Sequence, residues 1–126
     1  NLIMKHKHCV IRAEVNKPII NKGKARKFLR SLIKKIEMKE MYGPVASYCK
    51  MEGNRGITAF AVIETSHIAL HIWDEKSPSL VQFDVYSCKD FEPQRVFDHL
   101  DVMEPTKIDY KFFDREQNLE KFFQKK

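Results

Sequence analysis

Residues 64–88 hold a concentration of side chains that could carry out covalent chemistry. They comprise a serine, two histidines, a carboxylate and a cysteine: Ser66, His67, His71, Glu75 and Cys88. A hydroxyl or thiol becomes an effective nucleophile when a neighbouring base activates it, and imidazole is the commonest such base. Imidazole and thiolate are also frequent metal ligands. The stretch is therefore the first place to look for a functional site.

The two histidines do not predict a metal site. His67 and His71 lie four residues apart in a stretch that alternates like a strand, which separates them by roughly 13 Å at about 3.3 Å per residue. Zinc ligands converge at about 2 Å from the ion. Because one strand cannot bring both imidazoles to one ion, we expect no metal site here.

Two further functions rest on few residues. A histidine across a hairpin from Cys88 would make a thiolate nucleophile, but the neighbouring residues do not match the local signature of a known protease family. Arg55-Gly56 and the apolar run after it are similar to the start of an RNA-recognition strand. The positions of the stacking aromatics there are held by Ile57 and Ala59. We therefore expect no nucleic-acid partner.

A fourth interpretation accounts for the whole stretch. It resembles the processing site of the bacterial and archaeal S-adenosylmethionine decarboxylases, which carry a serine-histidine run followed by a second run that ends in cysteine. The matching residues are Ser66, His67, Ile68, His71, Trp73 and Glu75, then Asp84, Val85, Tyr86, Ser87 and Cys88, with Gly56 and Thr58 upstream.

The resemblance implies that the chain cuts itself between Thr65 and Ser66. The Ser66 hydroxyl would attack the Thr65 carbonyl and convert the amide into an ester. Elimination at Ser66 would then break the chain, and hydrolysis would leave a pyruvoyl group at residue 66 as the cofactor. The family assigns the residues that match His71 and Thr58 to this self-processing.

The resemblance also implies the mature reaction, decarboxylation of S-adenosylmethionine for spermidine and polyamine biosynthesis. In the family the pyruvoyl carbonyl forms a Schiff base with the substrate's amine and accepts the electrons that carbon dioxide leaves behind. The residue that matches Cys88 protonates the α-carbon, and the one that matches Glu75 holds the ribose hydroxyls. Trp73 and Met51 are the other residues assigned to substrate binding. The family implies a homodimer.

Three departures from the family pattern keep alternatives open. Thr65 stands where the family has glutamate, so the chain could be an unprocessed, non-catalytic homologue. Met51 (or Glu52) stands where an aromatic residue stacks on adenine, so a pyruvoyl-dependent decarboxylase of a different amino acid is a second alternative. The hairpin between Glu75 and Cys88 is longer than the family's, which shifts Cys88 relative to the serine.

The elements that would position these residues follow from hydrophobic periodicity. Two helices are expected at residues 22–40 and from Pro93, with a short polar helix from residue 116. Strands are expected at residues 6–15, 45–51, 57–64, 68–73, 80–86 and 107–113. This order predicts an α+β two-layer sandwich, mainly an antiparallel sheet with two helices packed on one face. In a regular strand Ser66 and His71 would face opposite ways, so we expect an irregularity near residues 65–66 or help from another strand.

Composition places the chain in a broad class. Its 126 residues correspond to one domain, residues 1–126, and 43% of them are hydrophobic. The net charge is +6, carried mostly on the first helical segment and the C-terminal end, as is usual for solvated helix faces. Neither a long apolar run nor a secretory signal is recognised, and an odd number of cysteines, three, favours a reducing compartment. We therefore expect a cytoplasmic protein without a membrane partner.

Overall fold

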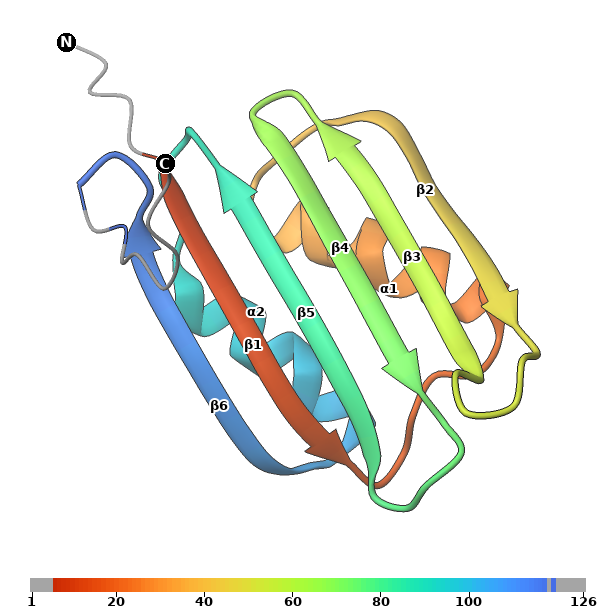
Figure 1. The fold of residues 1–126 in the computed structure, drawn as a ribbon. Helices are drawn as coiled ribbons and strands as arrows, with labels where there is room; N and C mark the ends of the chain where they lie inside the picture. Colours follow the sequence, from red (N-terminus) through yellow and green to blue (C-terminus); the bar gives the residue numbers. More distant parts are fainter. Residues whose placement is uncertain (1–5, 118, 120–126) are drawn as a thin grey trace, which may run out of the picture.

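A computed structural model describes residues 6–117 and 119, in which one antiparallel sheet carries both helices on the same face (Figure 1). The strand order across the sheet is β2-β3-β4-β5-β1-β6. In chain order the elements are β1 (Lys7–Val15), α1 (Lys22–Lys35), β2 (Glu40–Cys49), β3 (Gly56–Ile63), β4 (Ser66–Trp73), β5 (Ser79–Ser87), α2 (Pro93–Leu100), a 3₁₀ turn (Asp101–Met103) and β6 (Pro105–Asp114). The predicted α+β sandwich is confirmed.

Buried residues alternate with more exposed ones along the four central strands. In β4 every second residue is buried, namely Ile68, Leu70 and Ile72, and the residues between them lie on the other face. The same alternation buries Val81, Phe83 and Val85 in β5. Because successive strand residues point to opposite faces, the sheet has one face for the core and one face without helices. We call the latter the open face.

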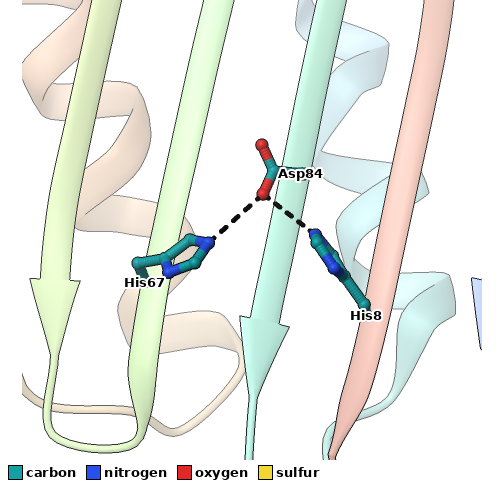
Figure 2. A group of neighbouring side chains, drawn as sticks. All are labelled: His8, His67 and Asp84. Carbon is teal, nitrogen blue, oxygen red and sulfur yellow. Dashed lines mark hydrogen bonds and ion pairs between the residues drawn. The ribbon is translucent and has the colours of Figure 1, made fainter. Parts of the chain in front are cut away.

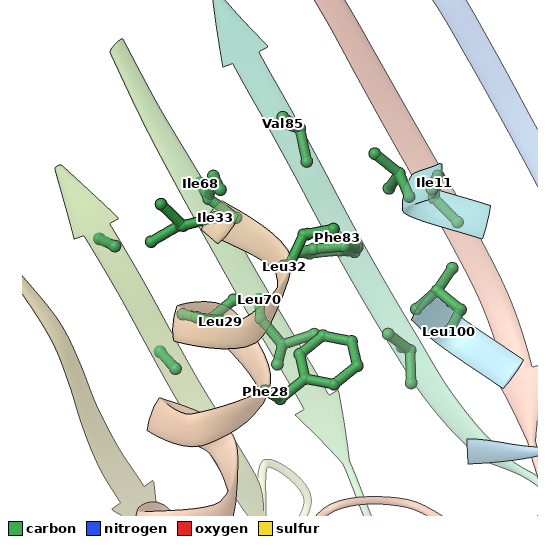
Figure 3. Close-up of a cluster of buried hydrophobic side chains, with 14 of the residues drawn as sticks. Ile11, Phe28, Leu29, Leu32, Ile33, Ile68, Leu70, Phe83, Val85 and Leu100 are labelled. Carbon is green, nitrogen blue, oxygen red and sulfur yellow. The ribbon is translucent and has the colours of Figure 1, made fainter. Parts of the chain in front are cut away.

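The core lies between the sheet and the two helices (Figure 3). Phe28, Leu29, Leu32 and Ile33 form one stripe of α1 and are buried, as helical spacing predicted. Burying a side chain of this size contributes about 1.5–3 kcal/mol relative to leaving it exposed. The stripe therefore fixes α1 across the sheet.

Within the described residues, we find no helix whose length and hydropathy would suit a membrane span.

Helix α1 is shorter than the 22–40 that periodicity predicted. It starts at an Asn21 cap, whose side chain accepts a hydrogen bond from the Lys24 N–H, and it ends at Lys35. Glu37 has a φ of 60°, and the N–H groups of Glu37 and Met38 donate back to the carbonyls of Lys34 and Ile33. These two bonds form a Schellman motif, which usually has glycine in the left-handed position. Because glutamate and not glycine occupies that position, the sequence did not indicate where the helix ends.

Strand β2 is longer than the 45–51 that was predicted, and it begins at Glu40. Gly43-Pro44, a pair typical of turns, lies inside this strand. The pairing of β2 with β3 shifts register between Tyr42 and Val45, and β2 is an edge strand. Proline lacks the N–H that a ladder needs, so an edge strand at an irregularity is where a sheet tolerates it.

The C-terminal half follows the prediction more closely. Helix α2 starts at Pro93, whose missing N–H is not needed in the first turn of a helix. Strand β6 then pairs with β1, which places β1 between β5 and β6. The short helix expected from residue 116 is not observed in the residues that can be described: residues 115–117 form a turn, and residues 118 and 120–126 lie outside them.

Candidate functional site

The predicted cleavage bond lies in the hairpin between β3 and β4. Glu64 and Thr65 form its two-residue turn, and Ser66 is the first residue of β4, paired with Ile63 on one side and Ser87 on the other. The φ of Ser66 is 155°, a conformation that residues with a Cβ rarely adopt. An irregularity at residues 65–66 was expected from the sequence, and Ser66 has one.

Thr65 is held on both its backbone and its side chain. Its carbonyl oxygen accepts a hydrogen bond of 2.9 Å from the Cys88 N–H. Its hydroxyl accepts a bond of 2.7 Å from the Ser87 hydroxyl and donates to the sulfur of Met38 at 3.2 Å. An N–H aimed at a carbonyl oxygen stabilises negative charge that develops there when a nucleophile attacks. The carbonyl oxygen next to Ser66 therefore has one backbone donor directed at it.

Cys88 follows the last residue of β5 and is a partly exposed free thiol. Its backbone contact with Thr65 places it at the same end of the sheet as Ser66. Cys9 differs, because burial, reinforced by the carboxylate of Asp84, raises the pKa of its thiol to about 11. A thiol with so high a pKa is a poor nucleophile and a poor acid near neutral pH. Cys88 is therefore the better candidate for proton transfer near Ser66.

A second group of predicted residues lies on the open face. Thr58 of β3 pairs with His71 of β4, and the Thr58 hydroxyl lies 3.3 Å from Nδ1 of His71. The ring of Trp73 stacks beside the imidazole at a centroid distance of 6.0 Å, and its Nε1–H donates to the side-chain oxygen of Asn54 at 2.8 Å. Gly56 allows β3 to pass close to β4 at this end of the pair, because a Cβ there would meet the Ile72 carbonyl.

Glu75 binds the turn between β2 and β3. Its two carboxylate oxygens accept hydrogen bonds from the N–H groups of Arg55 (2.8 Å) and Gly53 (3.1 Å). These two bonds hold the pKa of Glu75 below its ordinary value. Met51 lies in the same turn region and is 68% exposed. Both residues assigned to substrate binding here are at the surface.

The structure does not bring all the predicted residues together in one chain. Ser66, Thr65 and Cys88 lie at one end of β4, whereas Thr58, His71, Trp73 and Glu75 lie toward the other. Ser66 and His71 are five residues apart in one strand, which separates their Cα atoms by about 16 Å. The two groups are therefore distinct in a single copy of the chain.

Sequence reasoning missed a third group, on the open face (Figure 2). His8 of β1 and His67 of β4 both approach the same carboxylate oxygen of Asp84 in β5, at 3.0 and 3.5 Å. In the sequence, the histidine nearest to His67 is His71. No sequence signal joins His8 to Asp84, because they are 76 residues apart and meet only through the pairing of β1 with β5. These three side chains offer the ligand types that bind a metal.

Comparisons with known proteins agree on one family. The family model described as S-adenosylmethionine decarboxylase matches residues 8–116. A protein of Pyrobaculum islandicum named S-adenosylmethionine decarboxylase proenzyme is 38% identical over 73 residues, 56% of each chain. One of the same name from Pyrobaculum arsenaticum is 41% identical over 64 residues, 49% of this chain and 50% of the relative. The matches thus span about half the length of these curated relatives.

The fold comparison covers nearly the whole chain. The crystal structure of the adenosylmethionine decarboxylase from Aquifex aeolicus superposes with a TM-score of 0.69 at 24% sequence identity. The match covers 96% of this chain and 98% of the other. At this level of identity the likeness establishes the shared architecture of sheet and helices.

Proposed function

The chain belongs to the S-adenosylmethionine decarboxylase family, and on that basis we propose that it cleaves itself between Thr65 and Ser66 and then decarboxylates S-adenosylmethionine. The contact between the Cys88 N–H and the Thr65 carbonyl carries the proposal. It activates the bond next to a serine with an unusual backbone conformation.

The bonds that change in self-cleavage all lie at this end of the sheet. The Ser66 hydroxyl attacks the Thr65 carbonyl, whose oxygen develops negative charge toward the Cys88 N–H, and the peptide nitrogen leaves to form an ester. Loss of the α-proton of Ser66 then expels the Thr65 carboxylate and leaves a dehydroalanine. Water converts this residue into a pyruvoyl group and releases ammonia. The fragment that ends at Thr65 stays in place through strand pairing.

The residues around Ser66 fit the cofactor that would form there. The pyruvoyl carbonyl supplies an electron sink for loss of carbon dioxide. Cys88 follows directly after Ser87, the ladder partner of Ser66, and its thiol is partly exposed to an incoming substrate. We assign Cys88 as the general acid that protonates the substrate's α-carbon after carbon dioxide leaves.

We propose that Thr58 and His71 act on a second copy of the chain, so that the working unit is a homodimer. A general base must come within about 2.6–3.2 Å of the proton it takes, and about 16 Å of strand separates His71 from Ser66 in one chain. Both residues lie on the open face, where Val10, Phe60 and Val62 leave apolar surface exposed. Pairing of two open faces would bury that surface, and the proposal requires this pairing to bring His71 of one copy to Ser66 of the other.

Substrate recognition is proposed for the end of the sheet that holds Glu75, Trp73 and Met51. A carboxylate offers about four acceptor positions, and the backbone N–H groups of Arg55 and Gly53 use two at Glu75. The remaining positions can accept ribose hydroxyls. The exposed Met51 thioether is polarisable and can cover one face of the adenine.

The three free thiols suit a reducing cytoplasm.

One observation favours a second candidate, an unprocessed homologue without catalysis. Thr65 is β-branched, and its hydroxyl is engaged with Ser87 and Met38, which fixes the residue whose carbonyl must change geometry. In that case the chain would bind the substrate or a partner through the open face without cutting itself. A pyruvoyl-dependent decarboxylase of a different amino acid remains the alternative if Met51 does not support adenine.

The experiment is release of labelled carbon dioxide from carboxyl-labelled S-adenosylmethionine, with the wild type beside Ser66→Ala and Cys88→Ala. The proposal expects release by the wild type, none by Ser66→Ala, and strongly reduced release by Cys88→Ala. Saturable binding of S-adenosylmethionine without release would favour the non-catalytic homologue. Release from another labelled amino acid alone would favour the different substrate.

A further inference from the structure

We propose that His8, His67 and Asp84 form a binding site for one divalent transition-metal ion of the zinc class on the open face of the sheet. None of the three residues is assigned a role in cleavage, protonation or substrate binding. Two imidazoles and one carboxylate are a common ligand set for zinc and for other first-row metals.

The sheet register brings the three side chains together. His8 of β1 and His67 of β4 are both paired with Tyr86 of β5, one from each side. Asp84 lies two residues from Tyr86 on the same strand and therefore on the same face. Diagonal neighbours across a ladder are within reach of side chains as long as histidine. Both imidazoles consequently converge on the Asp84 carboxylate (Figure 2).

The distances suit a tetrahedral ion. Nε2 of His8 lies 3.0 Å and Nε2 of His67 lies 3.5 Å from the same oxygen of Asp84, and all three ligand atoms are within 4.8 Å of one another. Ligands at about 2.0–2.2 Å from a tetrahedral zinc ion are about 3.4 Å apart. The ligand atoms need to move by an ångström or less to close around an ion.

Aromatic rings hold the two imidazoles in this orientation. The ring of Tyr86 contacts His8 at a centroid distance of 5.4 Å and His67 at 5.5 Å, and Phe113 stacks on His8 at 5.5 Å. In a single copy of the chain the side chains of His8, Asp84 and His67 are 16%, 26% and 46% exposed, so an ion can reach them before two open faces pair. Fixed ligands that remain accessible are what a metal site needs.

The ion would join three strands beside the proposed cleavage bond. Its ligands come from β1, β5 and β4, and His67 directly follows Ser66. Three protein ligands leave the fourth tetrahedral position for water or for a ligand. Without an ion, His8 and His67 interact directly with the Asp84 carboxylate. The experiment must distinguish this arrangement from metal binding.

The test is equilibrium binding of Zn²⁺ to the full-length, tag-free protein in competition with a chromophoric chelator. His8→Gln and Asp84→Asn remove one ligand each, and His71→Gln is the matched control, an imidazole on the same strand and face as His67 but outside the group. We expect one Zn²⁺ per chain for the wild type and for His71→Gln. His8→Gln and Asp84→Asn should each weaken binding by about tenfold or more, the loss seen even for residues that only support metal ligands.

Two further measurements keep the result decisive. Unfolding temperatures in chelator show whether each variant folds, and Asp84→Asn, which preserves shape, carries the test if His8→Gln does not fold. X-ray absorption of the zinc complex should show nitrogen and oxygen ligands without sulfur, since Cys49 and Cys88 are free thiols that could bind zinc elsewhere. Absence of saturable binding, sulfur ligation, or equal binding by wild type and Asp84→Asn would each overturn the proposal.

Discussion

Replacing Gly56 with alanine is expected to destabilise the protein strongly, because the backbone of β3 passes too close to β4 at this residue to admit a side chain. A Cβ atom on Gly56 would lie 1.8 Å from the carbonyl oxygen and 2.8 Å from the carbonyl carbon of Ile72. The φ of Gly56 is also 156°, which residues with a Cβ rarely adopt.

The size of the effect follows from two contributions. The backbone conformation alone costs a residue with a Cβ about 1–3 kcal/mol. The clash involves backbone atoms, which cannot rotate away, so β3 must separate from β4 and lose one or two ladder hydrogen bonds, each worth about 1 kcal/mol. We therefore expect Gly56→Ala to lower the free energy of unfolding by about 2–5 kcal/mol. Domains of this size have about 5–15 kcal/mol in total.

Gly53 provides a matched control in the turn that precedes β3. It has a φ of 86°, but no heavy atom lies within 4 Å of where its Cβ would be. Gly53→Ala should therefore cost only the left-handed conformation, about 1–2 kcal/mol. Urea unfolding followed by circular dichroism compares the two variants with the wild type. Equal losses for Gly56→Ala and Gly53→Ala would refute the close approach of β3 and β4, and with it the placement of Thr58 against His71.

Three further predictions concern single side chains. Cys88→Ala should leave self-cleavage intact but lower the decarboxylation rate by about 10²–10⁴-fold, the usual contribution of a general acid; loss of cleavage as well would contradict the assigned role. Backbone hydrogen bonds hold the pKa of Glu75 below its ordinary 4.5, so Glu75 contributes stability above that pH and loses it as the pH falls through the lower folded value. Glu75→Gln should be less stable than wild type at neutral pH, and the gap in urea midpoint should close in acid; a gap that does not change with pH would argue against these bonds. Burial keeps the pKa of His99 below its ordinary 6.5. The wild type should therefore lose stability as the pH falls from 6.5 through the folded value, and thermal unfolding of His99→Gln should lack that slope.

The strands were predictable because their pattern has a period of two and needs no information from distant residues. Ile68, Leu70 and Ile72 occupy every second position of β4, and the structure buries that set. The start of α2 was equally clear, because Pro93 marks the first turn of a helix. Local signals of this kind also predicted the two-layer architecture.

Boundaries failed where a residue broke the usual preference for its position. Glu37 takes the left-handed conformation that ends α1. Glycine is the usual residue in that conformation, and a glycine there would have predicted the end of the helix. Gly43-Pro44 has the composition of a turn but lies in an edge strand with an irregular register. Both errors concern backbone conformation that tertiary pairing imposes and that residue type does not reveal.

In the candidate site, too, continuous sequence runs were predictable and contacts between distant strands were not. The runs that end at Glu75 and Cys88 could be found because they are continuous in sequence, and the family comparison confirms the resemblance that they carry. What sequence could not supply is register: it places Thr58 opposite His71 and joins His8 to Asp84 across 76 residues. The structure also separates Ser66 from His71 along β4. The assignment of both residues to one reaction remains a prediction, and it requires a second copy of the chain.

The most direct test of self-cleavage is the intact mass of the purified wild-type chain and of Ser66→Ala, taken fresh and after days at neutral pH. The account predicts two wild-type fragments that part between Thr65 and Ser66, the second with a pyruvoyl group at its start, and one uncut mass for Ser66→Ala. A wild-type chain that remains a single uncut mass throughout would contradict it.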